Sequence, residues 1–445
     1  MSAPGANRLG PYSMGTPLTV EEIDHRTAFR ALAPAWEALA RQAGSTGPFF
    51  HPYWFAVYAA DLARERRGAV ENSPFGAGTD RSLRLLVAHR RGQLAGVLPL
   101  VAERRRIAGV PVRVLRSLSD DHSQRFDVLA AQGQDGEEAI DALWRALASD
   151  HRWDVLELRD LPPGSHGEKL IARAEAEGFP TGTWASLNSP YLPLPDTEKA
   201  LEAALDGKFK ANLRRRGRRL AEEVGPLRLE HVRGGPELSQ ALTDGFALEA
   251  SGWKGAGGTA IAQDARLDAR YRSLARVFAE RNELSLFFLR AGERRVAFHF
   301  AIEANDVYYL FKPGYDEALA KYGLGHLLFM EVAKALIARG CNEIDFLGDD
   351  MPWKRDWTDK LRPHAFRYVM RKTPTGRALA AWKFRGLPAV RELADKVSEK
   401  AGTVRGALAG QIGTIGTVVD SMLHRNKEAA EAGESPAKPS EGEAK

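Results

Sequence analysis

The sequence predicts an α/β (α+β) protein built from two halves, each a mixed central sheet flanked by helices. Short runs rich in β-branched and aromatic residues alternate with segments of helical spacing. The order of these elements is nearly the same in the two halves. The 445 residues leave room for two or three domains, and a hydrophobic content of 44% supplies their cores.

The second half shows the clearer element order. It reads strand, two helices, three strands, helix, strand, and its last helix lies between Gly325 and Gly340. We expect Pro313 and Gly314 to end the strand that starts at Val307. The expected strands are 227–232, 284–290, 294–303, 307–311 and 343–347, and the first two helices are 236–250 and 264–281.

The first half repeats this order with weaker signals. Its expected helices are 27–43, 52–64, 137–149 and 165–177, and its strands 83–89, 94–101, 110–115 and 153–158. Its only glycine turn before a helix, 132–136, carries Asp135 where an anion would lie, which is electrostatically unfavourable. We expect a degenerate second copy that shapes a substrate cleft.

Five segments follow from these patterns. Residues 1–16 are rich in Gly, Pro and Ser and are expected to be disordered, 17–195 and 196–373 form the two halves, 374–424 is a helical extension, and 425–445 is a disordered tail. The extension is expected to pack on the body. The alternative is contact with a membrane surface or a partner through residues 386–424.

Composition excludes several classes. The net charge of +5, from 63 basic and 58 acidic residues, does not argue for DNA binding. The single Cys341 excludes an internal disulfide framework. No apolar run is long enough to span a membrane, and the N-terminus does not read as a signal peptide, so we expect a cytoplasmic protein. No His or Cys spacing suggests a metal site.

A glycine turn stands at the start of the last helix. Gly323, Leu324 and Gly325 precede its apolar face, so unpaired backbone N–H groups and the positive end of the helix dipole would face an anion there. Glycine also lets the backbone approach a phosphate closely. A lone turn of this kind is weak evidence, and many such turns serve geometry only.

Together with the order of elements around it, this turn resembles the GNAT acyltransferases, whose fourth strand and following helix hold the diphosphate of coenzyme A. The family pattern Q/R-x-x-G-x-G/A is matched at both glycines, while Ala320 stands at the Gln/Arg place and Lys321 one place on. The resemblance implies acetyl-CoA or another acyl-CoA as co-substrate. Its expected contacts are Lys321, Gly323, Leu324, Gly325 and His326.

The sequence looks closer still to the CelD-like (cellulose-biosynthesis type) acetyltransferases, relatives of the FemAB aminoacyltransferases. D-F-x-G at 345–348 and Trp353-Lys354-Arg355 carry this resemblance. Residues 208–214 resemble the K-x-R-x-N-x-R string of FemAB relatives, which implies an acceptor clamp. The alternative is a solvated basic helix face.

The resemblance implies an N-acyltransferase that acts on an amine of a sugar, a cell-envelope or exopolysaccharide precursor, or an amino-acid-like molecule. One alternative is a FemAB-type enzyme that uses aminoacyl-tRNA. The lack of a long helical insertion between Pro236 and Leu361 counts against tRNA. Another alternative is a non-catalytic scaffold for polysaccharide synthesis.

Candidate catalytic residues are His299, Asp345 and Lys354. His299 lies in an apolar strand, where a core role is the more common one. Asp345 should pair with Lys354 or Arg355, or have a raised pKa suited to a base. Lys354 could bind an acceptor phosphate or the thioester oxygen, or simply stack on Trp. Candidate substrate contacts are Lys208, Lys210, Arg214, Glu249, Trp253, Tyr309 and Trp353.

Overall fold

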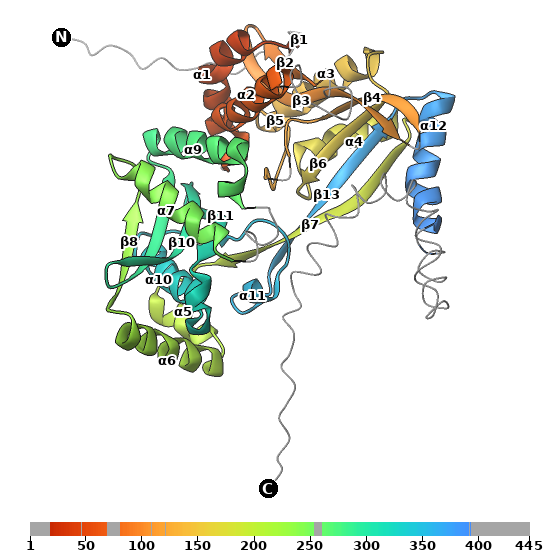
Figure 1. The fold of residues 1–445 in the computed structure, drawn as a ribbon. Coiled ribbons are helices and arrows are strands. Elements are labelled where there is room, and N and C mark those ends of the chain that lie inside the picture. The colour runs from red at the N-terminus through yellow and green to blue at the C-terminus, as the bar shows by residue number, and fades with distance from the viewer. Residues whose placement is uncertain are drawn as a thin grey trace, which may run out of the picture.

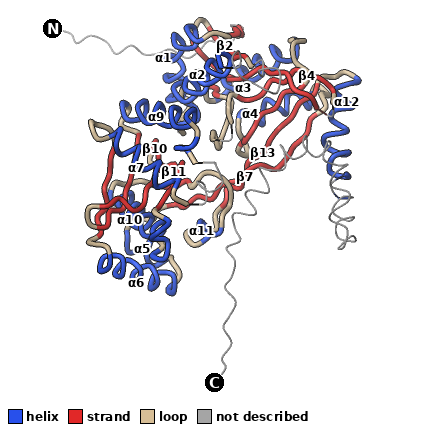
Figure 2. Tube along the Cα trace, in the orientation of Figure 1, coloured by secondary structure: helices blue, strands red, loops and turns tan. Residues whose placement is uncertain are grey.

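The protein forms one continuous mixed sheet with helices on both faces (Figures 1 and 2). The computed structural model describes residues 18–45, 47–68, 81–107, 109–120, 122–252, 260–390 and 392. Neighbouring strands follow the order β1-β2-β3-β4-β6-β13-β7-β12-β11-β10-β9-β8, and β5 pairs with β3 off this path. The trailing residues of the expected extension, the two expected disordered ends and Trp253 lie outside the described residues.

The first half carries strands β1 to β7. Two helices precede its main strands and two follow them, as the sequence predicts. The elements are β1 (Thr19–Ile23), α1 (Arg26–Gln42), η1 (Pro48–Phe50), α2 (Pro52–Gly68), β2 (Ser82–Arg90), β3 (Gln93–Ile107), β4 (Val110–Ser117), β5 (Leu129–Ala130), α3 (Gly133–Ser149), β6 (Val155–Leu161), α4 (His166–Ala176) and β7 (Thr181–Pro193).

The second half starts with two helices and then repeats the order. The elements are α5 (Glu198–Ala204), α6 (Gly207–Glu223), β8 (Leu227–Val232), α7 (Leu238–Ala250), η2 (Ile261–Gln263), α9 (Ala265–Glu280), β9 (Leu284–Ala291), β10 (Arg294–Ala304), β11 (Val307–Tyr315), η3 (Glu317–Tyr322), α10 (Leu324–Ala338), β12 (Glu343–Asp345), α11 (Pro352–Arg355), β13 (Leu361–Met370), α12 (Pro374–Ala381) and η4 (Trp382–Gly386). The expected fold class, two mixed sheets flanked by helices, is confirmed.

Two strands join the halves. β7 pairs with β13 along residues 181–190 and with β12 along residues 191–193, so one strand belongs to both sheets. β13 comes from the second half of the sequence but pairs with β6 and β7 of the first half. In Figure 1, β7 and β13 lie side by side across the middle of the molecule. The first-half sheet is therefore completed only by residues 361–370.

Apolar packing also crosses the junction. Phe49 and Trp54 of the first half pack against Phe311 of β11, with ring centroids 5.6 and 5.4 Å apart. A separate cluster on the other face of the second sheet joins α10 and α6 through Leu328 and Leu220, both fully buried. The second sheet is thus covered on one face by α7, α9 and the first half, and on the other by α10, α6 and α5.

None of the described helices is long and apolar enough to cross a membrane.

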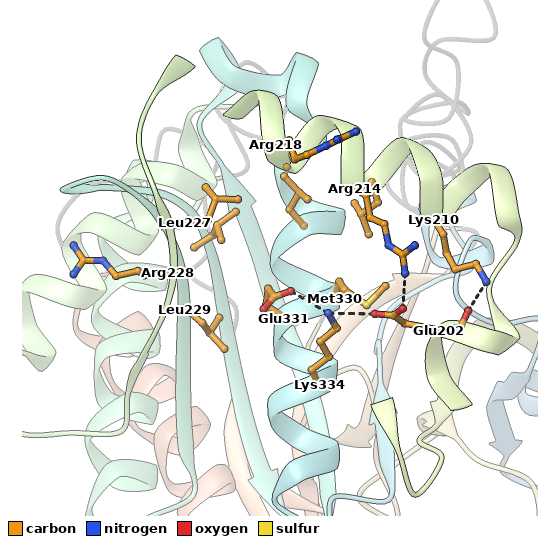
Figure 3. Close-up of a pocket in the computed structure, with 14 residues that line it drawn as sticks. Glu202, Lys210, Arg214, Arg218, Leu227, Arg228, Leu229, Met330, Glu331 and Lys334 are labelled. Carbon is orange, nitrogen blue, oxygen red and sulfur yellow. Dashed lines mark hydrogen bonds and ion pairs between the residues drawn. The ribbon is translucent and has the colours of Figure 1, made fainter. Parts of the chain in front are cut away.

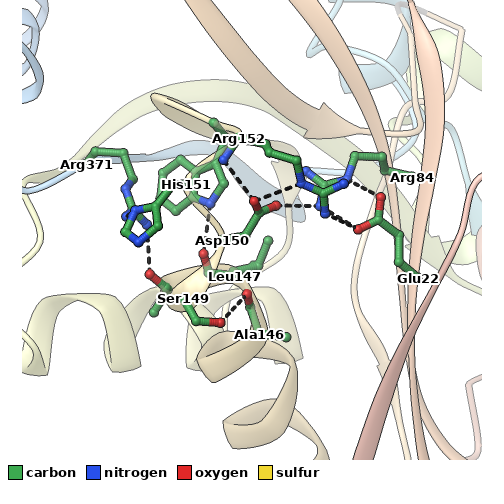
Figure 4. Close-up of polar contacts among 11 residues, drawn as sticks. Glu22, Arg84, Ala146, Leu147, Ser149, Asp150, His151, Arg152 and Arg371 are labelled. Atoms are coloured by element: carbon green, nitrogen blue, oxygen red, sulfur yellow. Dashed lines mark hydrogen bonds and ion pairs between the residues drawn. The ribbon is translucent and has the colours of Figure 1, made fainter.

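A cluster of ion pairs holds the edge strand β1 to the first sheet (Figure 4). Arg84 of β2 donates to Glu22 of β1 at 2.8 and 2.7 Å and to Asp150 at the end of α3 at 2.5 Å. Arg152 bridges the same two carboxylates. Burial would raise the pKa of Asp150, but hydrogen bonds from Arg152 and Arg84 lower it to about 2. These contacts compensate for the shortness of β1, a strand that the sequence analysis does not predict.

The expectation that Pro313 and Gly314 end a strand is wrong. β11 continues to Tyr315, and its residues 313–315 pair with β10. A bulge at Phe300 and Ala301 shifts the register between the two strands. Gly314 is needed for close approach, since a Cβ there would lie 2.6 Å from the backbone of Glu249. Proline is tolerated because β11 pairs with β12 only along residues 307–309.

The strand exchange gives a test of how the chain divides. A fragment of residues 18–195 lacks β13, and we expect it to remain unfolded by circular dichroism because β6 and β7 would both lose a partner. The same fragment followed by a flexible linker and residues 361–390 should fold cooperatively. Cooperative unfolding of the shorter fragment alone would show that the first half is independent of β13.

Candidate functional site

β11 and β12 pair in parallel and then diverge. Only Val307, Tyr308 and Tyr309 of β11 have partners in β12, and the last paired residue of β12 is Asp345. Beyond this point β11 pairs only with β10 among the described strands. Backbone groups of β11 on the β12 side are therefore available to a ligand.

The start of α10 lies beside this divergence. Gly323 adopts a left-handed conformation, with φ 65° and ψ 47°, and forms the N-cap of α10. Its carbonyl accepts the first helical hydrogen bond, from the backbone N–H of Leu327, at 3.1 Å. The N–H groups of Leu324, Gly325 and His326 precede this bond and have no acceptor within the helix. Such an end favours an anion.

Two cations flank the turn. The Arg216 guanidinium of α6 lies 2.9 Å from the position that a Cβ on Gly323 would take. Among the described residues, Arg216 forms no ion pair with a carboxylate. Lys321 lies 3.4 Å from Glu223, a carboxylate that hydrogen bonds from Tyr322 and Arg219 hold at a pKa of about 2. Arg216 is therefore the cation of this pair that is available to a bound anion.

His326 is fixed in one orientation on the first turn of α10. The indole N–H of Trp357 donates to its Nδ1 at 3.1 Å, so the neutral ring carries its proton on Nε2, 3.5 Å from Asp356. Burial lowers the pKa of His326, and Arg216 lowers it further against the opposing effect of Asp356. The ring packs on Phe209 of α6 at 5.2 Å. It thus adds an N–H donor, and no charge, near the turn.

Asp345 lies fully buried at the end of β12, between two arginines. Arg125 of the first half donates to its Oδ2 at 2.6 Å, and Arg362 of β13 donates to the same atom at 2.7 Å. Burial would raise the pKa of Asp345, but the two guanidinium groups hold it below its ordinary value. Asp345 is therefore an ionised structural partner, and a group with a lowered pKa is a poor general base at neutral pH.

The expected partners of Asp345 were wrong. The Lys354 ammonium is buried and donates to the backbone carbonyls of Leu347 at 2.7 Å and Asp349 at 2.5 Å. Arg355 instead pairs with Asp350 at the surface. The string 345–355 folds back on itself because Leu347, with φ 51°, and Gly348, with φ 57°, turn the chain after β12. Lys354 holds this loop closed, and its role as an acceptor contact remains a proposal.

His299 lies in the core. Its side chain is 2% exposed and its Nδ1 is 3.3 Å from the Tyr308 hydroxyl. Burial lowers the pKa of His299 to about 3, so the imidazole is neutral. The burial of the ring and its low pKa favour the core interpretation of this residue over the base.

The expected substrate contacts do not form one group. Glu249 is buried and accepts from the backbone N–H of Ile261 at 2.9 Å, while Tyr309 is buried against Phe49. Trp353 packs on Phe346, and Lys208 is exposed on α6.

The start of α6 does meet the loop that carries Lys354, because Phe209 packs on Trp357 at 5.3 Å. However, the Lys210 ammonium donates to the carbonyl of Glu202 and Arg214 pairs with its carboxylate. Both cations thus face α5 and not the loop.

Several residues of this site were not predicted. Arg125, Arg216, Arg362 and His364 carry no local motif that marks them, and Arg125 is 220 positions from its partner Asp345. The one available signal is the polar stretch 120–127 between apolar segments. His364 of β13 lies 3.3 Å from the Nε of Arg125, and burial lowers its pKa to about 4.

The first half has the corresponding strand pair, with a buried carboxylate at the same place. β4 and β6 pair in parallel along 114–116 and 155–157, and Glu157 takes the place that Asp345 has in β12. Arg105 pairs with Glu157 at 2.6 Å, and Arg159 lies 3.6 Å from it. Both halves thus bury an ionised carboxylate where the parallel strands part.

Comparison with known proteins supports this description. Residues 207–355 match the family model described as "Acetyltransferase (GNAT) domain". This stretch of the second half is therefore similar to GNAT acetyltransferase domains, and the match does not single out the CelD-like branch. A search of curated proteins found no match.

One solved structure shares this fold at low sequence identity, and two others superpose less well. FemX superposes with a TM-score of 0.51 at 12% identity, covering 81% of this chain and 100% of FemX. A tandem GNAT protein from the clavulanic acid biosynthesis pathway gives a TM-score of 0.41 at 14% identity, with 80% and 99% covered. The C-terminal domain of a putative lysylphosphatidylglycerol synthetase from Agrobacterium fabrum gives 0.41 at 13%, with 64% and 83% covered.

The buried charge predicts a specific stability change. Asp345→Asn leaves two guanidinium groups without their shared carboxylate, so we expect the free energy of unfolding to fall by about 3–5 kcal/mol. Asp350→Asn, in the exposed pair with Arg355, is the control and should cost less than about 1 kcal/mol. Urea unfolding at pH 7 measures both, and equal costs would contradict this description of Asp345.

The same variant should change the acid dependence of stability. The pKa of Asp345 is lower in the folded protein than the ordinary value of about 3.9, so its stabilisation is present above that value and is lost as the pH falls through the folded pKa. The parent should therefore lose more stability between pH 5 and acid than Asp345→Asn, as followed by urea unfolding at a series of pH values.

Proposed function

We propose that this protein is an N-acyltransferase that uses acetyl-CoA or another acyl-CoA. The observation that supports it most directly is the left-handed Gly323 turn at the start of α10, beside the divergence of β11 and β12. The diphosphate would bind the N–H groups of residues 324–326, with Arg216 as the nearest cation. Lys321 would contribute after its pair with Glu223 rearranges.

The thioester would lie along β11, where the strand no longer pairs with β12. A backbone N–H of β11 facing this space would stabilise the oxyanion that forms when an amine attacks the thioester carbonyl. The acyl group passes directly to the amine nitrogen, and the thiolate leaves with a proton. Asp345 keeps β12, β13 and the Arg125 loop in place around this point, as a positioning residue.

The acceptor is proposed to enter from the side of the first half. Phe49 and Trp54 bring that half onto β11, and Arg125 reaches β12 from it. The proposed acceptor is an amine of a sugar, a cell-envelope or exopolysaccharide precursor, or an amino-acid-like molecule. The alternatives are aminoacyl transfer from aminoacyl-tRNA, as in FemAB enzymes, and a non-catalytic scaffold. In residues 236–252 and 260–361, the described helices form no long arm of the FemAB type.

A glycine substitution tests the donor site. A Cβ at Gly325 would meet only the Tyr315 ring, at 3.9 Å, so Gly325→Asp should fold normally while it places a carboxylate among the N–H donors. We expect the dissociation constant for CoA, measured by calorimetry, to rise by about a hundredfold or more.

A matched control is Gly207→Asp. This glycine starts α6, and a Cβ there would meet nothing within 4 Å, so the same charge at another helix start should leave CoA binding unchanged. Equal CoA binding by the parent and Gly325→Asp would remove this turn from the proposal. Thermal stabilisation by aminoacyl-tRNA, with none by any acyl-CoA, would favour the FemAB-type alternative.

A further inference from the structure

A separate cavity of about 680 Å³ opens between α6, α10, α5 and strands β8 and β9 (Figure 3). Its volume lies in the range of small-molecule sites, which is about 300–1,000 Å³. No step of the proposed acyl transfer uses it. It is not the cleft between the halves that the sequence predicts, because α5, α6, α10, β8 and β9 all belong to the second half.

Helix α6 separates this cavity from the donor turn. Phe209 and Arg216 lie on the face toward the start of α10, where they contact His326 and Gly323. Lys210, Arg214 and Gly217, spaced by four and three residues, line the cavity together with Arg218. Because β10 lies between β9 and β11, the strand part of the cavity floor, on β8 and β9, is about 10 Å or more from the divergence of β11 and β12.

The floor of the cavity is aliphatic. Leu227, Leu229 and Leu289 come from the two strands, and Leu327 and Met330 from α10. Gly217 leaves space on the α6 side of the cavity, since a Cβ there would lie 3.3 Å from the side chain of Leu327. A glycine inside a helix lowers helix stability by about 1 kcal/mol relative to alanine, so the space beside Leu327 comes with a less stable α6.

The rim is cationic. Lys210, Arg214, Arg218, Arg228 and Lys334 line the cavity together with only two carboxylates, Glu202 and Glu331. Figure 3 shows that Arg214 and Lys334 converge on Glu202, while Arg228 extends away. Lys334 lies 3.4 Å from Glu202 and 3.5 Å from Glu331, so both carboxylates are already paired.

Two cations on α6 remain available to a ligand. The Lys210 ammonium donates to a backbone carbonyl of Glu202, at 2.7 Å, which leaves its charge uncompensated by that contact. Among the described residues Arg218 forms no ion pair with a carboxylate. Lys210 and Arg218 stand about 12 Å apart along α6, so an anionic group at this rim would meet one of them without displacing an existing ion pair.

We propose that this cavity binds a single-chain anionic amphiphile, an alkyl chain that ends in a phosphate or carboxylate. The chain would cover the leucines of the floor, and the head group would bind Arg218. The lining holds no aromatic side chain, which argues against a nucleobase that would need stacking.

Calorimetry of the full-length protein with dodecyl phosphate tests this site. We expect saturable binding, with much weaker binding of dodecanol and of inorganic phosphate, because each lacks one of the two features. Leu229→Trp, which fills the cavity from β8, should weaken dodecyl phosphate binding by about tenfold or more.

Two arginines of α6 provide a matched pair. Arg218→Glu should also weaken binding by about tenfold or more, while Arg215→Glu should not. Arg215 is exposed on the same helix, does not line the cavity and contacts Asn212. Both are surface changes, so circular dichroism should show intact folds even if Leu229→Trp is unstable.

The Gly325→Asp variant tests whether this site is independent of the donor turn. Gly325→Asp should bind dodecyl phosphate as the parent does, whether or not CoA binding is lost. Loss of dodecyl phosphate binding in Gly325→Asp, equal effects of the two arginine variants, or equal affinity for dodecanol would each overturn the proposal. So would binding only to vesicles of anionic phospholipid, which would indicate a membrane-facing surface.

Discussion

The fully buried carboxylate of Asp345 constrains the arrangement of both halves. A charge without access to water is tolerated only with partners of opposite charge, and here these come from the first half and from β13. The end of β12, the Arg125 loop and β13 must therefore all be in place before this carboxylate is stable. The same point fixes where β11 and β12 part, so one ion-pair cluster determines the geometry of the proposed donor site.

The two halves use the same feature to different ends. Glu157 and Asp345 occupy corresponding places where parallel strands diverge. Neighbouring arginines lower the pKa of each carboxylate, so that both stay ionised. In the first half, Arg105 and Arg159, which both lie against Glu157, come from that half itself. In the second half, Asp345 pairs with Arg125 of the first half and with Arg362 of β13. Both halves thus keep a buried, ion-paired carboxylate, and only the one on β12 ties the two halves together.

The sequence was sufficient for elements with a strong local pattern. β8 was predicted to the residue, and α1 to α4, α7, α9 and α10 were predicted within a few residues, because their apolar spacing is regular, whereas α5 and α11 were not predicted. β7 and β13 were missed because they carry Pro190 and Pro363 and lack an apolar run, and pairing with each other stabilises them. The Gly323 turn was predicted from local chemistry. Arg125 and Arg362 were not, since only the tertiary fold brings them to Asp345.

The return of β13 to the first sheet also fixes an order of events during synthesis. Residues 194–360 lie between β7 and β13, so the later half of the protein is nested inside the earlier one. When β7 leaves the ribosome, its partner on one side, β13, does not yet exist, and its partner on the other, β12, is some 150 residues away in the chain. The first sheet therefore keeps an open edge until residues 361–370 have been synthesised. The usual sequence of domain folding from the amino terminus onward is therefore reversed for the final closure of this molecule.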